Sequence, residues 1–232
     1  MMVSYDFFSE HYDKIMQSYD SLNEGLQKRT LLIQKIIQKH CPNAETLLEI
    51  GCGTGNILKL LQRNYRLFGL DISEKMLEIA RKKVPKATFY NFDMRKFHLL
   101  IKFDVIVCVY DSINHLLRLS EWKSMFKCVA THLKDTGIFI FDFNTLYELA
   151  RLGNSSPYIK KIGKDLVIMQ TSFYKEEILE WKIIGFKSYG ENNYKMYEES
   201  IRERGFSIKK IHRLLDKEFD FNSKVAMGWF TL

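Results

Sequence analysis

The stretch LEIGCGTGN, residues 48–56, joins a short apolar run to three glycines spaced two residues apart. One acidic residue, Glu49, lies inside the apolar run, which raises the question of what its charge does there. In an open parallel sheet, ligands bind beyond the carboxyl ends of the strands, and the turn after the first strand is the usual place. Glycines in such a turn let the backbone approach a ligand closely. The stretch therefore predicts a strand, a ligand-binding loop and a helix that begins at Asn56.

The first two thirds of the chain alternate between strand-like and helical segments. After an opening helical pair at roughly 6–20 and 23–40, strand-like runs occupy 46–50, 65–70, 87–92, 103–110 and 137–143, and helical patterns occupy 55–64, 73–84 and 119–133. The strands are continuously apolar, which is typical of a parallel sheet that is buried on both faces. The pattern predicts an α/β protein with a doubly wound, mostly parallel sheet.

From about residue 158 the pattern changes to successive strand candidates. KDLVIMQTSFY, EILEWKIIGFKSYG and NYKMYEES are separated by turn-prone residues and by no helix, which predicts an antiparallel sheet. A final helix at 207–217 and two short runs, EFDFN and VAMGWFTL, predict a return to the main sheet. We therefore expect a main domain formed by 1–155 and 201–232, with an antiparallel β lobe at 156–200 that covers the substrate site.

Composition sets further limits on what the chain can be. Its 232 residues are 46% hydrophobic and 14% aromatic, which is ample for a sizeable core. No apolar run reaches the ~18 residues of a membrane span, and the first residues lack the pattern of a signal peptide, so a cytoplasmic location is expected. The four cysteines (Cys41, Cys52, Cys108 and Cys128) show no CxxC spacing. They are interpreted as buried thiols, and neither disulfides nor a metal site is expected.

The net charge of +7 raises the possibility of a nucleic-acid partner. The basic residues, however, are scattered over amphipathic helices and interleaved with acids, which is typical of a solvated face. The charge pattern therefore favours solubility over a phosphate-binding track.

The stretch LLEIGCGTGN, residues 47–56, closely resembles the first motif of class I S-adenosylmethionine-dependent methyltransferases. Its spacing is GxGxG, whereas a dinucleotide-binding loop has GxGxxG. The resemblance implies that S-adenosyl-L-methionine is the cofactor, that the strand carboxylate orients the loop near the cofactor's amino group, and that the loop backbone passes the methionine moiety. The cofactor-binding residues it implies here are Glu49, Gly51, Cys52, Gly53, Gly55 and Asn56.

The second motif, FGLDISEKMLEIAR, places Asp71 at the end of the second strand, about 20 residues after the first glycine, where ribose hydroxyls are expected. An ionised carboxylate can accept from two hydroxyl donors at once. A helix N-cap is the alternative role for Asp71, but Ser73 fits that role better. The resemblance implies that Ile72 and Met76 contact the adenine ring, although Met76 is equally a core residue.

The third motif, NFDMRKF, follows the third strand. The resemblance implies that Asp93 accepts a hydrogen bond from the exocyclic amine of adenine and that the Met94 backbone amide donates to the ring. A turn aspartate is the alternative interpretation of Asp93.

The fourth motif, VCVYDSINHLL, follows the fourth strand. In the family this segment lines the methyl-transfer pocket, which adds Tyr110 to the cofactor-binding residues and makes Asp111, Ser112, Asn114 and His115 candidates for contact with cofactor or substrate. The string resembles the branch of small bacterial and archaeal methyltransferases that carry an antiparallel lobe and include glycine and amino-sugar N-methyltransferases. The DFNT of 142–145 and the YD of Tyr12 and Asp13 resemble that branch as well.

Two residues are candidates for a catalytic role. His115 has an ordinary pKa near 6.5 and is placed to accept the proton that an amine releases, although a structural role at the start of a helix is the alternative. Tyr12 is placed to close over the methionine end of the cofactor, and a packing role is equally open.

The sequence thus predicts an enzyme that transfers a methyl group to a small-molecule acceptor, with an amine nitrogen favoured. An RNA methyltransferase is the second interpretation, but the chain has VYDS where amino-methylating nucleic-acid enzymes show an NPPY-like tetrapeptide. A non-catalytic cofactor-binding module is the third. No membrane partner is expected, and monomer and homodimer stay open. The lobe is expected to roof an enclosed pocket, with Trp181, Phe186 and Tyr197 as lining residues unless sheet packing explains them.

Overall fold

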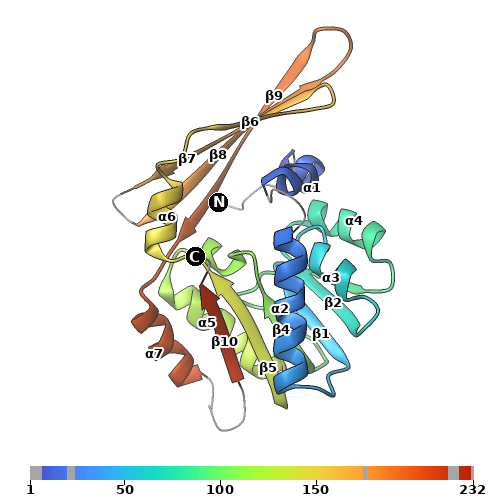
Figure 1. Cartoon of the computed structure of the whole chain (residues 1–232), viewed down its shortest axis with the longest axis vertical. Helices are drawn as coiled ribbons and strands as arrows, with labels where there is room; N and C mark the ends of the chain where they lie inside the picture. The colour runs from blue at the N-terminus through green and yellow to red at the C-terminus, as the bar shows by residue number, and fades with distance from the viewer. Residues whose placement is uncertain (1–6, 20–23, 175–176, 219–224, 231–232) are drawn as a thin grey trace.

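The computed structural model describes residues 7–19, 24–174, 177–218 and 225–230. Two sheets organise the chain (Figure 1). The main sheet has the strand order β10-β5-β4-β1-β2-β3, and every pair of neighbours is parallel. Its strands are β1 (Thr46–Ile50), β2 (Arg66–Asp71), β3 (Thr88–Asn91), β4 (Phe103–Cys108), β5 (Leu133–Phe143) and β10 (Val225–Phe230). The order reverses between β1 and β4, which confirms the predicted doubly wound fold and places the ligand-binding edge there.

Helices cover both faces of this sheet. They are α2 (Glu24–His40), α3 (Asn56–Leu61), α4 (Glu74–Lys83), α5 (Leu119–His132) and α7 (Ile208–Glu218), and a short 3₁₀ helix η1 spans Ser112–His115. Alternate strand residues point to opposite faces. Leu47 and Val105 therefore pack with α2, α3 and α4, whereas Leu48 and Ile106 pack with α5 and α7. The inner strands β1, β4 and most of β2 and β5 are buried on both faces, as predicted, whereas the edge strand β3 is partly exposed.

Two local features, the end of β4 and the helix α6, differ from the predicted pattern. β4 ends at Cys108 and not at 110, because Tyr110 and Asp111 adopt left-handed backbone angles (φ 56° and 49°). α6 (Leu146–Leu152) was not predicted, and Thr145 caps it by accepting a hydrogen bond from the Glu148 amide. VAMGWFTL supplies β10 beside β5, as expected for a return to the main sheet. Most of EFDFN lies outside the described residues.

The antiparallel lobe has one strand more than the pattern predicted. It contains β6 (Tyr158–Ile162), β7 (Asp165–Phe173), β8 (Ile178–Ser188) and β9 (Tyr194–Arg204), paired in that order. The missed strand, YIKKI, mixes lysines with apolar residues and lacks the long apolar run of its neighbours. β9 continues past residue 200 and leads toward α7, so the lobe is joined to the main domain by a sheet strand (Figure 1).

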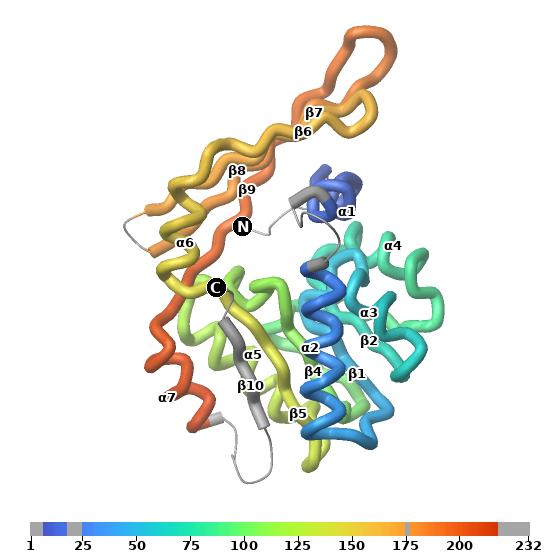
Figure 2. The backbone as a smooth tube through the Cα atoms, viewed as in Figure 1, coloured from blue at the N-terminus to red at the C-terminus, as the bar shows by residue number. Residues whose placement is uncertain are grey.

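The opening helix α1 (Phe8–Tyr19) lies between the lobe and the main domain (Figures 1 and 2). Phe7, Phe8 and Ile15 pack against apolar residues of the lobe sheet. The backbone amides of Phe7 and Phe8 also donate to the Glu199 carboxylate, at 2.6 and 3.3 Å. α1 is therefore attached to the inner face of the lobe. No helix in the described segments is both long and apolar enough to cross a bilayer.

Gly185 of β8 makes the attachment of α1 possible, because a Cβ atom there would lie 1.9 Å from the Phe7 ring. We expect Gly185→Ala to displace that ring and to lower the free energy of unfolding by about 1–3 kcal/mol, the usual cost of overpacking. Urea denaturation measures the change. In a Phe7→Ala background the same substitution should cost little, because the obstacle is gone. An equal cost in both backgrounds would contradict this packing.

Candidate active site

The glycine loop forms the carboxyl edge of the main sheet between β1 and α3. Gly51, Gly53 and Gly55 have φ angles of 69°, 50° and 77°. A residue with a Cβ atom is strained at such angles by roughly 1–2 kcal/mol. The Gly51 and Cys52 amides donate to the Leu70 carbonyl of β2 at 2.7 and 3.1 Å, which turns the loop toward the second strand.

The three glycines differ in what surrounds them. A Cβ atom at Gly51 would lie 2.7 Å from the Ser112 side chain, and one at Gly55 would lie 3.3 Å from Ala80. At Gly53 it would meet nothing within 4 Å. Gly51 and Gly55 therefore permit close packing, whereas Gly53 borders open space that a ligand can fill.

Asp71 is tied to this loop. Its Oδ2 atom accepts from the Gly53 amide at 2.8 Å, and its Oδ1 atom accepts from the Ser73 amide at 2.9 Å. Each oxygen keeps a second lone pair for a hydroxyl donor. Burial raises the pKa of the Asp71 carboxyl, and the hydrogen bonds from Ser73 and Gly53 oppose that rise.

The two residues expected at the adenine ring, Ile72 and Met76, differ in their exposure to solvent. Ser73 caps α4 by accepting from the Met76 amide at 3.3 Å, as predicted. Ile72 is 44% exposed, whereas Met76 is 3% exposed. Ile72 thus presents an exposed apolar side chain at this edge, whereas Met76 is a buried residue of α4.

Glu49 is a buried carboxylate with an unused oxygen. The side chain is 4% exposed, and within the described residues its Oε2 atom has no hydrogen-bond partner. Burial raises the pKa of Glu49 well above its ordinary value, and the nearby Asp71 charge raises it further. A buried oxygen without a donor is costly, and a cationic donor supplied by a ligand would remove that cost.

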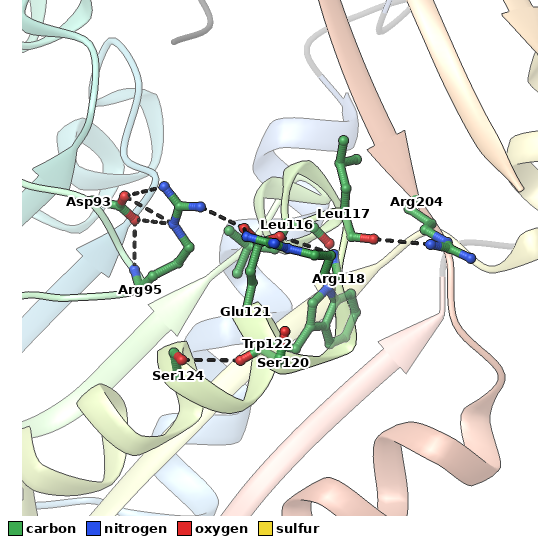
Figure 3. A network of polar contacts seen from close by, with 10 residues as sticks. All are labelled: Asp93, Arg95, Leu116, Leu117, Arg118, Ser120, Glu121, Trp122, Ser124 and Arg204. Carbon is green, nitrogen blue, oxygen red and sulfur yellow. Dashed lines mark hydrogen bonds and ion pairs between the residues drawn. The ribbon is translucent and has the colours of Figure 1, made fainter. Parts of the chain in front are cut away.

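Asp93 is already engaged by a neighbour (Figure 3). Arg95 donates from Nε and Nη2 to the two Asp93 oxygens at 2.9 and 2.5 Å, and its backbone amide donates to Oδ1 at 2.9 Å. The Nη1 atom of Arg95 reaches Glu121 of α5 at 2.6 Å. The hydrogen bonds from Arg95 lower the pKa of Asp93 against the effect of burial. Asp93 therefore closes a turn and pairs with Arg95, and its contact with adenine stays a prediction, as does that of the Met94 amide.

The loop after β4 holds two successive non-glycine residues in left-handed geometry, Tyr110 and Asp111. Such a conformation costs of order 1–3 kcal/mol per residue and persists only where neighbours enforce it. Here the Asp111 amide donates to Asp142 Oδ1 of β5 at 2.8 Å. Arg29 of α2 pairs with the other Asp142 oxygen, and its guanidinium carbon lies 4.3 Å from the centre of the Tyr110 ring.

Two candidates of the fourth motif are structural. Asn114 is fully buried, donates to the Asn144 and Arg204 carbonyls at 2.9 and 3.1 Å, and accepts from the Asn144 amide at 2.9 Å. Ser112 donates to the Val109 carbonyl at 2.9 Å. Both side chains fix the loop where β4, β5 and β9 meet.

The two catalytic candidates lie at this same edge. The His115 ring is 3.3 Å from the Arg202 carbonyl through Nδ1. Burial raises the pKa values of Asp71 and Asp111, and His115 is close enough to oppose that rise at both carboxyls. Burial raises the pKa of the Tyr12 hydroxyl, and the charges of Asp111, Tyr110 and Asp71 raise it further. The structure therefore brings Tyr12 and His115 together with residues of the second and fourth motifs.

Asp13 attaches α1 to the glycine loop. Its Oδ1 atom accepts from the Thr54 hydroxyl at 2.6 Å and from the Asn56 amide group at 2.9 Å. Lys83 of α4 donates to Asp13 Oδ2, Thr54 and Asn56 at 2.6, 2.9 and 2.6 Å. This network holds α1 over the loop and places Tyr12 at the site.

We expect Asp13→Ala to lower the free energy of unfolding by about 1–3 kcal/mol, since it removes the carboxylate partner of the partly buried Lys83 and the acceptor of the Thr54 and Asn56 side chains. Lys187→Ala is the matched control, because it removes an exposed contact of α1 with the lobe, the Glu10–Lys187 pair at 2.6 Å, which is worth about 0–1 kcal/mol. Urea denaturation compares the two, and equal losses would contradict the role of Asp13.

The same network has a pH dependence. The hydrogen bonds from Lys83, Thr54 and Asn56 lower the pKa of Asp13 in the folded protein. Its stabilising effect is therefore present above the ordinary value near 3.9 and is lost as the pH falls through the lowered folded value. Asp13→Ala should remove this part of the acid sensitivity.

Three residues of the site, Glu203, Arg29 and Lys83, escaped the sequence analysis. Glu203 of β9 is 4% exposed, accepts from Trp181 Nε1 at 2.8 Å and from Asn144 Nδ2 at 3.4 Å, and is hydrogen-bonded to Asp111. It stands among charged residues on a strand of mixed composition, so no local pattern marks it. Arg29 and Lys83 escaped for a different reason: both lie on helices whose basic residues were interpreted as a solvated face.

The expected lining residues of the lobe divide between its two faces. Trp181 and Tyr197 pack in the cluster that includes Phe7, and Tyr197 stacks on Phe7 at 5.0 Å between ring centres. Phe186 is paired with Met196 one position along from Gly185 and Tyr197. Since strand residues alternate between faces, Phe186 points to the opposite face and cannot line a pocket with the other two.

The comparisons with known proteins agree with this geometry. Residues 47–137 match the family model described as a methyltransferase domain. Among solved structures, an S-adenosylmethionine-dependent methyltransferase from Clostridium acetobutylicum is similar with a TM-score of 0.75 and 25% identity, over 92% of this chain and 87% of that one. The chain carries a methyltransferase domain over residues 47–137. The cofactor of this family is S-adenosylmethionine.

Two curated proteins are similar to this chain. The chain is 26% identical to the putative methyltransferase YqeM of Bacillus subtilis, over 91% of this chain and 84% of that protein. It is 30% identical to a dTDP-3-amino-3,6-dideoxy-alpha-D-glucopyranose N,N-dimethyltransferase of Streptomyces fradiae, over 58% of this chain and 54% of that protein. The chain thus spans about half the length of the Streptomyces relative.

The residues of the methyltransferase domain fit S-adenosylmethionine in three ways. The space at Gly53 would accommodate the ligand backbone, the free lone pairs of Asp71 would suit ribose hydroxyls, and the unused oxygen of Glu49 would suit a cationic amino group. The predicted positions of Cys52, Gly55 and Asn56 belong to the same loop, although Cys52 is buried and Asn56 is bonded to Asp13 and Lys83. Cys41, Cys52 and Cys108 are buried thiols, as predicted, whereas the fourth cysteine, Cys128, is only partly buried.

Proposed function

We propose that this protein transfers a methyl group from S-adenosylmethionine to the amine nitrogen of a small molecule. The acceptor would lie between the carboxyl edge of the main sheet and the antiparallel lobe of 156–200. One observation carries the choice of an amine: the strand-four loop and the lobe meet at three carboxyl groups, those of Asp111, Asp142 and Glu203. Such a site attracts a cation.

When bound, the cofactor supplies a methyl group on a positively charged sulfur, which is reactive without help from the protein. The protein's task is then to align the acceptor in line with the departing sulfur and to keep water out. Glu49, Gly53 and Asp71 would hold the cofactor, and Tyr12 on α1 would close the site. After methyl transfer, His115 would receive the proton that the methylated nitrogen releases.

The relatives support an amine acceptor. The Streptomyces fradiae protein is named for N,N-dimethylation of an amino sugar linked to a nucleotide. The surface charges agree with a small acceptor, because many basic residues pair with acids, as in Lys182–Glu198 at 3.1 Å and Arg202–Glu180 at 2.8 Å. These cations are not available for a continuous phosphate track.

A methylation screen with labelled cofactor tests the proposal. The panel contains small amines, including nucleotide-linked amino sugars, and bulk transfer RNA. We expect label in an amine and none in RNA. Transfer RNA binding, measured by gel shift, should be weak at all salt concentrations, whereas an RNA enzyme that engages six or more phosphates would lose about 10³ or more in affinity between 50 and 200 mM salt. Salt-sensitive binding with label in RNA alone would favour an RNA methyltransferase.

A further inference from the structure

Two carboxyl groups from distant parts of the chain meet beside the strand-four loop. Asp111 follows β4, and Glu203 lies near the end of β9, where this strand descends from the lobe past the carboxyl edge of the main sheet (Figure 1). The two side chains are hydrogen-bonded to each other. Two carboxyl groups in this contact hold a shared proton, because two adjacent negative charges repel each other.

The surroundings hold Glu203 in place without neutralising the pair. Trp181 and Asn144 donate to Glu203 at 2.8 and 3.4 Å, and both are neutral. The groups whose charges act on Asp111 are Glu203, Asp142, His115 and Arg29. Arg29 is paired with Asp142, so its charge is largely matched there. The cluster therefore keeps surplus negative charge in a site that is mostly removed from water.

A second observation points independently to a cationic ligand at this edge. Glu49 on β1 is 4% exposed, and its Oε2 atom has no partner within the described residues. The thiol of Cys108, at the end of β4, is close enough to Asp142, Glu49 and Asp111 for all three charges to raise its pKa. The unused oxygen and the carboxyl pair thus belong to one neighbourhood, and among the described residues neither is hydrogen-bonded to a cationic side chain.

We propose that the Asp111–Glu203 pair binds the amine of the methyl acceptor and receives its proton. This inference rests on the proposed function. The acceptor reaches the pair as an ammonium ion and gives one proton to a carboxylate, which frees the nitrogen lone pair. The nitrogen then forms a bond to the methyl carbon as the carbon–sulfur bond breaks, and the electron pair of that bond stays on the sulfur.

The proton balance of this step suits the pair. The sulfur loses its positive charge, the methylated nitrogen gains one, and the proton held by the pair passes to solvent. Burial raises the pKa of Glu203 to about 7, so the group can take up and release a proton near neutral pH. Tyr12 of α1 belongs to the same neighbourhood, because burial and then the Asp111 charge raise the pKa of its hydroxyl.

The test compares an amine with its hydroxyl counterpart. The protein is saturated with S-adenosylhomocysteine and titrated by calorimetry with dTDP-3-amino-3,6-dideoxyglucose, and then with the same nucleotide sugar carrying a hydroxyl in place of the amine. We expect the wild-type protein to bind the amine at least about tenfold more tightly, as for a charge-assisted hydrogen bond. Asp111→Asn and Glu203→Gln should each reduce that preference to less than about threefold.

Three features keep the result interpretable. Asparagine tolerates the left-handed backbone at position 111, so Asp111→Asn changes charge and not conformation. Glu198→Gln, on the same strand and 52% exposed in its side chain, is the matched control and should keep the full preference. The S-adenosylhomocysteine affinity of each variant reports whether the cofactor site is intact.

The outcomes separate this inference from the function on which it rests. Equal binding of the two sugars by the wild type, or an undiminished preference for the amine in both variants, overturns the role of the pair and leaves the proposed function standing. If neither sugar binds while S-adenosylhomocysteine does, the acceptor class is wrong and both proposals fall. If Asp111→Asn and Glu203→Gln lose the preference for the amine while the wild type and Glu198→Gln keep it, the result supports the role of the pair.

Discussion

Gly53→Val is expected to abolish the binding of S-adenosylmethionine. Gly53 is the loop glycine whose missing Cβ atom borders open space, with nothing within 4 Å. A valine side chain would fill the space that the ligand backbone needs, and it would also strain the backbone at a φ of 50°. Calorimetry should show micromolar binding by the wild type and none by the variant.

Gly163→Val is the matched control for Gly53→Val. Gly163, between β6 and β7, has a φ of 63° and also has nothing within 4 Å of its Cβ position. Both variants should lose roughly 1–2 kcal/mol of stability from backbone strain, but only Gly53→Val should lose the cofactor. Retained binding in Gly53→Val, or equal loss in Gly163→Val, would show that the loop does not form the site.

Asp71→Ala should weaken S-adenosylmethionine binding by about 1.5–3 kcal/mol, or roughly 10- to 150-fold, because it removes a charged acceptor for two ribose hydroxyls. The substitution also releases the Gly53 and Ser73 amides. Asp104→Ala is the matched control, since Asp104 is a buried carboxylate that accepts from the Thr46 amide at 3.0 Å at the opposite edge of the sheet.

Calorimetry separates a loss of cofactor affinity from a general loss of stability. Asp104→Ala should lower stability and leave cofactor affinity unchanged, whereas Asp71→Ala should lower affinity. Burial raises the pKa of the Asp71 carboxyl, so this group takes up a proton at a higher pH than an exposed aspartate does. As the pH is lowered, the cofactor affinity of the wild type should therefore begin to fall at that higher pH. An unchanged affinity in Asp71→Ala would move the ribose site elsewhere.

The sequence predicted the parts of the molecule that depend on neighbours along the chain. β1, the glycine loop and the start of α3 at Asn56 follow from a short apolar run, three glycines and the pattern after them. The Ser73 cap is equally local. Because apolar residues at every strand position require two covering layers, the doubly wound sheet was also predictable.

The contacts that assemble the site are long-range, and for that reason they were not predictable. Arg29 and Asp142 are 113 residues apart in the chain, and Glu203 reaches Asp111 from a different sheet. No periodicity within a segment specifies such pairs. The grouping of Phe186 with Trp181 was a different error, because strict alternation along a strand already puts residues 181 and 186 on opposite faces.

Asp93 pairs with a nearby arginine, Arg95, at the oxygens that were expected to face adenine. The motif NFDMRKF was interpreted by resemblance, with Asp93 facing adenine. Arg95, two positions later, takes both carboxylate oxygens and links them to Glu121 of α5 (Figure 3). The spacing of an aspartate and an arginine at i and i+2 in a turn was visible in the sequence, and it supported the turn-aspartate alternative.

Equilibrium binding of the cofactor tests the central claim most directly, namely that the edge formed by Glu49, Gly53 and Asp71 is an S-adenosylmethionine site. The full chain is titrated by calorimetry with S-adenosylmethionine, S-adenosylhomocysteine and NAD in turn. The geometry predicts micromolar binding of the first two and no binding of NAD, because the loop has GxGxG and not the GxGxxG of a dinucleotide site. Tight binding of NAD without binding of S-adenosylmethionine would contradict the claim.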